Sequence, residues 1–147
     1  MEKPSSPVVI FLEQPPAASS EFFKIVSAAA KNGGIDFRVA ESVPEAERQL
    51  KKLHSLQSGP VALIIPVLYP DLLRAVKTLP KADPLMKLVF LYTKDEEQVA
   101  RQMLASYVLV GLERTLAACE EGALTPVLEE AARTVAQRRR QRTVLAS

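Results

Sequence analysis

The stretch "VALIIPVLYP", residues 61–70, decides the fold of this chain. Its unbroken apolar run, 61–65, indicates a strand covered on both faces, because a strand with one wet face would alternate apolar and polar residues. Pro66 follows at once, and Pro70 suits the first position of a helix, where a missing N–H costs little. The stretch therefore predicts a buried strand, a corner and a helix.

Four other apolar runs, each followed by a longer stretch or a connection, extend this pattern along the chain. These predicted strands are "VVIFL" (8–12), "FRVA" (37–40), "KLVFLY" (87–92) and "YVLV" (107–110). Alternation of strand and helix implies a parallel sheet with helices on both faces, joined by right-handed crossovers. We predict an α/β fold, a flavodoxin-like three-layer (βα)5 sandwich whose five parallel strands take the order 2-1-3-4-5.

Local signals mark where the predicted helices begin and end. Capping boxes start helices at "SVPE" (42–45) and "TKDE" (93–96), and "NGG" (32–34) is a helix-stop signal. The inward-facing stripes are predicted to include Leu73 on the third helix and Val99 on the fourth. Helices are predicted at 19–32, from 42, after Pro70, from 93, and at 125–142.

The composition fits one domain in a reducing compartment. A chain of 147 residues can bury a core without staples, and its single cysteine, Cys119, cannot form an intramolecular disulfide. No apolar run reaches about 18 residues, so we expect a cytoplasmic protein without a membrane span or signal peptide.

Positive charge is concentrated near the C-terminus. Arg133 and four arginines between 138 and 142 carry five charges, and subtracting them from the net +2 leaves −3 elsewhere. We predict a globular domain at 1–136 and a basic tail, or linker to an output domain, at 137–147. Because no aromatic residues flank the arginines, helix-end complementation is favoured over a nucleic-acid site.

Ligands and catalytic groups of such sheets sit beyond the carboxyl ends of the strands. The residues at these ends are few and mostly uncharged. They are Glu13 and Gln14 after the first strand, Pro66 after the third, Thr93 and Lys94 after the fourth, and Val110 and Gly111 after the fifth.

In element order and in the corner "IPVLYP", the whole chain resembles the response-regulator receiver domain. In that family an aspartate after the third strand accepts a phosphoryl group, and a proline follows four residues later. Pro70 matches that proline, and Pro66 falls on the aspartate. By the same resemblance, the Mg²⁺-binding acidic pair falls on Glu13 and Gln14, the hydroxyl on Thr93, and the lysine on Val110 or Gly111.

Phosphoryl transfer needs a carboxylate nucleophile, a cation held by acidic oxygens, and charged and hydroxyl groups on the phosphoryl oxygens. Pro66 has no such oxygen, and Gln14 adds no negative charge to Glu13. Thr93 is explained by helix capping, and Asp71 by its place in the first turn of a helix. We therefore predict no catalytic residue, no metal, no cofactor and no enzyme activity.

Other common sites lack a matching motif. His54 has no second histidine or cysteine nearby, so a surface residue is a better interpretation than a metal ligand. The chain has no GxGxxG, Walker loop or Ser-His-Asp order, which disfavours nucleotide binding and hydrolysis.

The sequence thus predicts a phosphorylation-independent pseudo-receiver that acts by binding protein. As the resemblance implies, a partner or second copy would dock on the face formed by helix 4, strand 5 and helix 5. Tyr107 matches the aromatic of the family's fifth strand, and it equally fits a strand residue packed at the sheet edge. The residues of this face are Gln98, Arg101, Gln102, Tyr107, Glu129 and Arg133.

Two alternatives stay open. One is an unrelated flavodoxin-like enzyme or enzyme subunit, for which the sequence shows no polar constellation. The other is a small-molecule sensor that uses the crevice at the strand ends, around Glu13, Gln14, Pro66, Tyr69 and Thr93.

Overall fold

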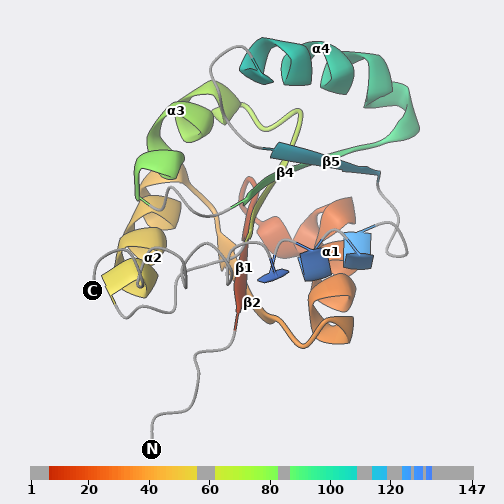
Figure 1. Ribbon diagram of the computed structural model, residues 1–147. Helices are drawn as coiled ribbons and strands as arrows, with labels where there is room; N and C mark the ends of the chain where they lie inside the picture. Colours follow the sequence, from red (N-terminus) through yellow and green to blue (C-terminus); the bar gives the residue numbers. More distant parts are fainter. Residues whose placement is uncertain are drawn as a thin grey trace, which may run out of the picture.

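A five-stranded parallel sheet of order β2-β1-β3-β4-β5 forms the centre of the computed structural model (Figure 1). The structure describes residues 7–55, 62–82, 87–108, 114–118, 124–126, 128–130 and 132–133. The strands are β1 (Val8–Leu12), β2 (Asp36–Ala40), β3 (Ala62–Pro66), β4 (Lys87–Tyr92) and β5 (Arg114–Ala118). The helices are α1 (Glu21–Asn32), α2 (Val43–Ser55), α3 (Leu72–Ala82) and α4 (Glu97–Val108), with 3-10 turns at Ala17–Ser19 and Lys94–Glu96.

The predicted parallel α/β architecture and the order 2-1-3-4 of its first four strands are confirmed. All residues of β1 and β3 are buried, as expected for inner strands covered on both faces. In β2, which has only β1 as a neighbour, exposed and partly buried positions alternate from Asp36 to Val39, and Ala40 is buried. The unbroken apolar runs therefore predicted the inner strands correctly.

The predicted position of the fifth strand in the sequence is wrong. Tyr107 and Val108 are the last residues of α4, and the strand that pairs with β4 is Arg114–Ala118, from Leu88 opposite Arg114 to Tyr92 opposite Ala118. A short apolar run can belong to a strand or to a helix, and here α4 continues into the run as far as Val108. Val110, predicted to end the fifth strand, lies outside the described residues.

Two apolar cores cover the two faces of the sheet. Alternate residues of β1, β3 and β4 point to opposite faces, so each strand serves both cores. One core unites Ile10, Leu63 and Phe90 with α2, α3 and Ala100 of α4. The other unites Phe11, Ile64 and Leu91 with α1, Leu124 and Leu128. Figure 1 shows α1 on one side of the sheet and α2 and α3 on the other.

Two residues predicted to face the core are exposed. Leu73 of α3 is 57% exposed and Val99 of α4 is 42% exposed. The buried stripe of α3 runs through Leu72, Ala75, Val76 and Leu79. Leu73 is turned by about 100° from Leu72 around the helix axis, which places it outside that stripe.

The C-terminal helix is described in part. Residues 124–126, 128–130 and 132–133 are helical, within the predicted range 125–142 and one residue before it. Leu124 and Leu128 are fully buried against the α1 side of the sheet. The predicted tail, 137–147, lies outside the described residues. In the described part of the chain, no helix has both the length and the apolar character needed to cross a bilayer.

A pair of leucine substitutions on α3 tests the core assignment. Leu79→Ala removes a fully buried side chain and should lower the free energy of unfolding by about 2–5 kcal/mol. Leu73→Ala, the matched control on the same helix, should change it by less than about 0.5 kcal/mol. Urea unfolding followed by circular dichroism measures both. Equal losses would contradict the assigned stripe.

Candidate functional site

The carboxyl ends of β1, β3 and β4 meet at one edge of the sheet, as parallel pairing requires. Glu13 follows β1, Pro66 ends β3 and Thr93 follows β4. The structure therefore places these three predicted site residues at a common edge. What each one contacts decides whether the edge can bind a cation or transfer a phosphoryl group.

Pro66 is buried and lies opposite Leu91 in the β3–β4 register. Successive N–H groups of a strand point to opposite sides, and the Val67 N–H donates to the Leu91 carbonyl at 2.9 Å on the β4 side. The nitrogen of Pro66 therefore faces β1, where register pairing with β3 has already ended at Ile64. Proline has no N–H to donate toward β1, so the β1–β3 ladder stops here, at the last residue of β3, while pairing with β4 continues through Val67.

The corner after Pro66 is built from backbone turns. The Pro66 carbonyl accepts from the Tyr69 N–H at 3.0 Å, and the Tyr69 carbonyl accepts from the Leu72 N–H at 3.1 Å. These turns lead straight into α3, whose Ala75 N–H donates to the Asp71 carbonyl at 3.0 Å. The corner thus forms without any carboxylate at its first position.

The carboxylate of Glu13 is bound within its own loop. Its Oε1 accepts from the Gln14 N–H and its Oε2 accepts from the Ser20 hydroxyl, both at 2.8 Å. The Ser20 hydroxyl also accepts from the Phe22 N–H at 3.2 Å, and so caps α1. Glu13 therefore links the end of β1 to the start of α1.

A second carboxylate, Glu41, holds the same loop from the end of β2. Its Oε2 accepts from the Ala17 N–H at 2.8 Å, while its own N–H donates to the Glu45 carboxylate at 3.0 Å. Our sequence analysis did not select Glu41. The signal was present, because Glu41 is the first polar residue after a predicted strand, as Glu13 is.

Thr93 begins α4 through a capping box. Its N–H donates to the Glu96 carboxylate at 2.9 Å, and its carbonyl accepts from the Glu96 N–H at 3.0 Å. The predicted capping role of Thr93 is confirmed, and this pairing commits the residue to the turn that precedes the helix.

Tyr69 lies at this edge, 7% exposed. Burial raises the pKa of its phenol above the usual value, and the negative charges of Asp71 and Glu13 raise the pKa further. The edge therefore has a buried phenol within electrostatic reach of two carboxylates. Among the described residues, no group of three histidine, cysteine, aspartate or glutamate side chains could hold a metal ion.

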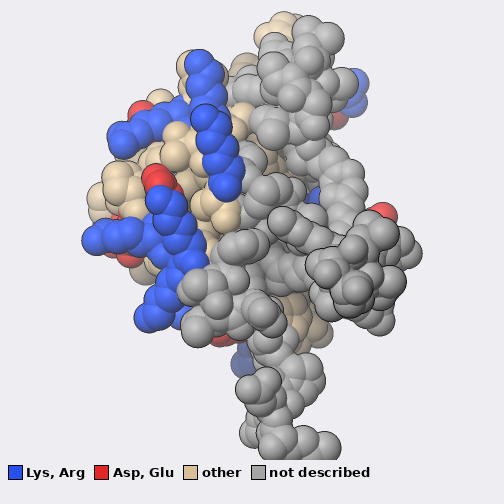
Figure 2. All heavy atoms as spheres, turned by 60° about the vertical axis from the view of Figure 1, so that its left-hand side comes forward, with Lys and Arg blue, Asp and Glu red and all other residues tan. Residues whose placement is uncertain are grey.

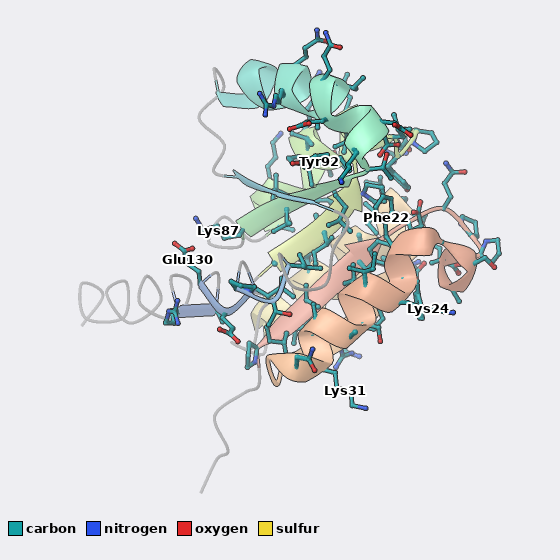
Figure 3. The ribbon with its side chains drawn as sticks, turned by 90° about the vertical axis from the view of Figure 1, so that its right-hand side faces the viewer. Phe22, Lys24, Lys31, Lys87, Tyr92 and Glu130 are labelled. Atoms are coloured by element: carbon teal, nitrogen blue, oxygen red, sulfur yellow. The ribbon has the colours of Figure 1, made fainter. Side chains whose placement is uncertain are left out.

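An open hollow of about 410 Å³ lies beside this edge. Of the five residues of the predicted crevice, it includes Glu13 and Gln14. Phe22, labelled at the start of α1 in Figure 3, forms part of its wall. Its lining residues are Glu13, Gln14, Pro16, Ser19, Ser20 and Phe22.

The predicted interaction face is divided by the sheet. Gln98, Arg101 and Gln102 are exposed on α4, and Arg101 pairs with Glu97 at 2.8 Å. Glu129 and Arg133 are exposed on the helical segment packed against the opposite face of the sheet. Tyr107 belongs to α4 and is not a strand residue.

Comparison with known proteins shows a fold and no family. No family model and no curated protein matches the chain. An adenylate cyclase from Rhodopirellula baltica is similar in structure, with a TM-score of 0.68, 10% identity and coverage of 97% of this chain and 98% of that one. A response regulator receiver domain protein from Clostridium thermocellum has a TM-score of 0.56 and 11% identity, over 90% and 97%.

A third similar structure, an uncharacterized protein from Neptuniibacter caesariensis, has a TM-score of 0.65 and 13% identity, over 92% of this chain and 95% of that one. Identities this low show a shared fold alone. The chain therefore has the parallel α/β fold of receiver domains and of other flavodoxin-like proteins.

A Glu13→Gln substitution tests the structural role of this carboxylate. The amide has a single acceptor oxygen, so the change should lower the free energy of unfolding in EDTA by about 0.5–1.5 kcal/mol. Glu130→Gln, on an exposed helical residue, is the control and should have little effect. Urea unfolding measures both. Stabilisation by Glu13→Gln in EDTA would instead indicate a carboxylate kept for an absent cation.

Proposed function

We propose that this domain is a phosphorylation-independent pseudo-receiver that acts in signal transduction by binding protein. The observation that carries the proposal is the buried proline at the corner after β3, at the position that the resemblance to receiver domains assigns to the phospho-accepting aspartate. A receiver-like fold with no nucleophile at that position retains its surfaces and loses its reaction. We infer no catalytic step for this domain.

The groups around the corner support the same proposal. Both oxygens of Glu13 accept hydrogen bonds inside the β1–α1 loop, and Thr93 is paired with Glu96. A divalent cation would have to break the loop contacts of Glu13 to gain one carboxylate, and Gln14 would offer it only a neutral oxygen. The contacts of Glu13 and Thr93 hold a loop and a helix start in place.

We propose the sides of α4 and of the C-terminal helix as the contact surface for a partner or a second copy. Gln98, Arg101 and Gln102 are exposed on α4, while Glu129 and Arg133 are exposed on the other helix. Residues 1–136 would form the module, and 137–147 a basic tail or a linker to an output domain.

The hollow beside Glu13 supports a second candidate, a small-molecule sensor. Its volume of about 410 Å³ suits a small metabolite, and its wall combines a carboxylate, two serines and the ring of Phe22. The hollow is open to solvent at the start of α1. A ligand bound there would act on the cap of α1 through Ser20.

Thermal melts with a phosphate mimic separate these proposals. Mg²⁺ with beryllofluoride should shift the melting temperature by less than about 1 °C, because the domain lacks an acceptor carboxylate. A receiver domain with an intact aspartate, measured in parallel, is the positive control. A clear Mg²⁺-dependent shift would overturn the pseudo-receiver proposal. A reproducible shift with a member of a metabolite set, lost in Phe22→Ser, would favour the sensor.

Light scattering tests the proposed homodimer. If copies associate through α4 and the C-terminal helix, Arg101→Glu with Arg133→Glu should convert the dimer to monomer. Arg48→Glu with Lys77→Glu changes the charge equally on α2 and α3, and should leave the dimer intact. A wild-type monomer at high concentration would exclude the homodimer, and loss of the dimer in both variants would exclude this face.

A further inference from the structure

Six exposed cationic side chains gather on one side of the molecule. Figure 2 shows lysine and arginine side chains concentrated on the side where α2 and α3 lie. The two helices share one core and lie side by side (Figure 1), so their outer faces form one surface, here called the α2–α3 surface. Its cationic residues are Arg48, Lys51 and Lys52 from α2, and Arg74, Lys77 and Lys81 from α3.

Charge interactions connect the two helices. Lys51 pairs with Glu47 at 2.8 Å, and Arg74 pairs with Asp71 at 3.7 Å. The pKa of Glu47 is lowered mainly by Lys51, and to a smaller extent by Arg74 of the neighbouring helix. Arg74 therefore lies within electrostatic reach of α2.

The pairing leaves an excess of positive charge. Against these six cations, the described residues of α2, of α3 and of the corner before α3 include three carboxylates, Glu45, Glu47 and Asp71. Within the part of the chain that the structure describes, Arg48, Lys77 and Lys81 form no ion pair. Three exposed charges are thus available to a ligand without the loss of an ion pair among the described residues.

An apolar side chain accompanies these charges. Leu73, 57% exposed, lies one helical turn before Lys77, and residues four apart are neighbours on a helix surface. Leu68, 61% exposed, lies in the corner that leads into the same helix. The surface therefore offers both cations and apolar area.

We propose that the α2–α3 surface binds an acidic segment of a partner protein. Carboxylates of that segment would pair with Arg48, Lys77 and Lys81, and an apolar side chain among them would cover Leu73. This surface is distinct from the sides of α4 and the C-terminal helix. The inference therefore does not rest on the function proposed above.

Two observations favour an acidic protein segment over nucleic acid. Glu47 and Asp71 lie among the cations, and a continuous row of phosphates would meet both carboxylates. A protein segment can place a polar or cationic residue opposite them. In addition, neither α2 nor α3 contains Phe, Tyr or Trp on which bases could stack.

Fluorescence anisotropy with a labelled peptide tests the proposal. The probe is a synthetic 15-residue peptide of glutamate and aspartate with interspersed leucines, titrated with the full chain at about 50 mM NaCl, where exposed charges are weakly screened. There are three comparison ligands: the same peptide with serine in place of each leucine, a DNA duplex, and phosphatidylserine vesicles. Peptide binding should weaken as salt is added.

Two matched double variants locate the site. Lys77→Glu with Lys81→Glu should weaken peptide binding by about tenfold or more. Lys24→Glu with Lys31→Glu makes the same change of charge on α1 and should weaken it by less than about threefold. Figure 3 shows Lys24 and Lys31 on α1, and both side chains are exposed. In each pair one lysine lies in the last turn of its helix.

Leu73→Ser tests the apolar contact. It should weaken binding of the leucine-containing peptide and leave binding of the serine version unchanged, because only the former can cover this side chain. Circular dichroism of each variant checks that it is folded. Tighter binding of the DNA duplex or the vesicles than of the peptide would overturn the proposal in favour of a phosphate ligand. Equal losses of peptide affinity in the two lysine double variants would also overturn it. So would a dissociation constant for the peptide above about 1 mM.

Discussion

The burial of β3 between β1 and β4 is the constraint on which the rest of the structure depends. Every residue of β3 is buried, and its side chains supply both cores. Full burial of each of its large aliphatic side chains contributes about 1.5–3 kcal/mol relative to exposure. Because β3 holds β1 and β4 in parallel, the ends of all three strands meet at one edge, and the loops that could form a site begin there.

At that edge, backbone turns and carboxylate contacts build the corner after β3 and the loop after β1. The nitrogen of Pro66 faces β1 and has no hydrogen to donate, so the β1–β3 ladder ends at this corner while the β4 side stays paired. Glu13 and Glu41 accept hydrogen bonds from the β1–α1 loop, and Glu96 accepts one from Thr93. Carboxylates at this edge hold loops and helix starts in place.

Parts of this description could be predicted from particular residues. Unbroken apolar runs predicted the buried strands, and the Thr93–Glu96 box predicted a helix start, because both signals are local. The run 107–110 was misassigned, since a short apolar stretch fits a strand and a helix equally well. Glu41 was not selected, because its partner Ala17 lies 24 residues away.

The sequence by itself determined the parallel α/β class, the order of the first four strands and the proline at the β3 corner, because burial patterns and turn chemistry are written in neighbouring residues. Only the tertiary structure decided where the fifth strand lies and which charges share a face. The sequence placed the positive charge in the C-terminal arginines, whereas packing of α2 beside α3 brings six cations together. Net charge sums over the whole chain, while a partner meets one surface, so no average over the sequence could reveal it.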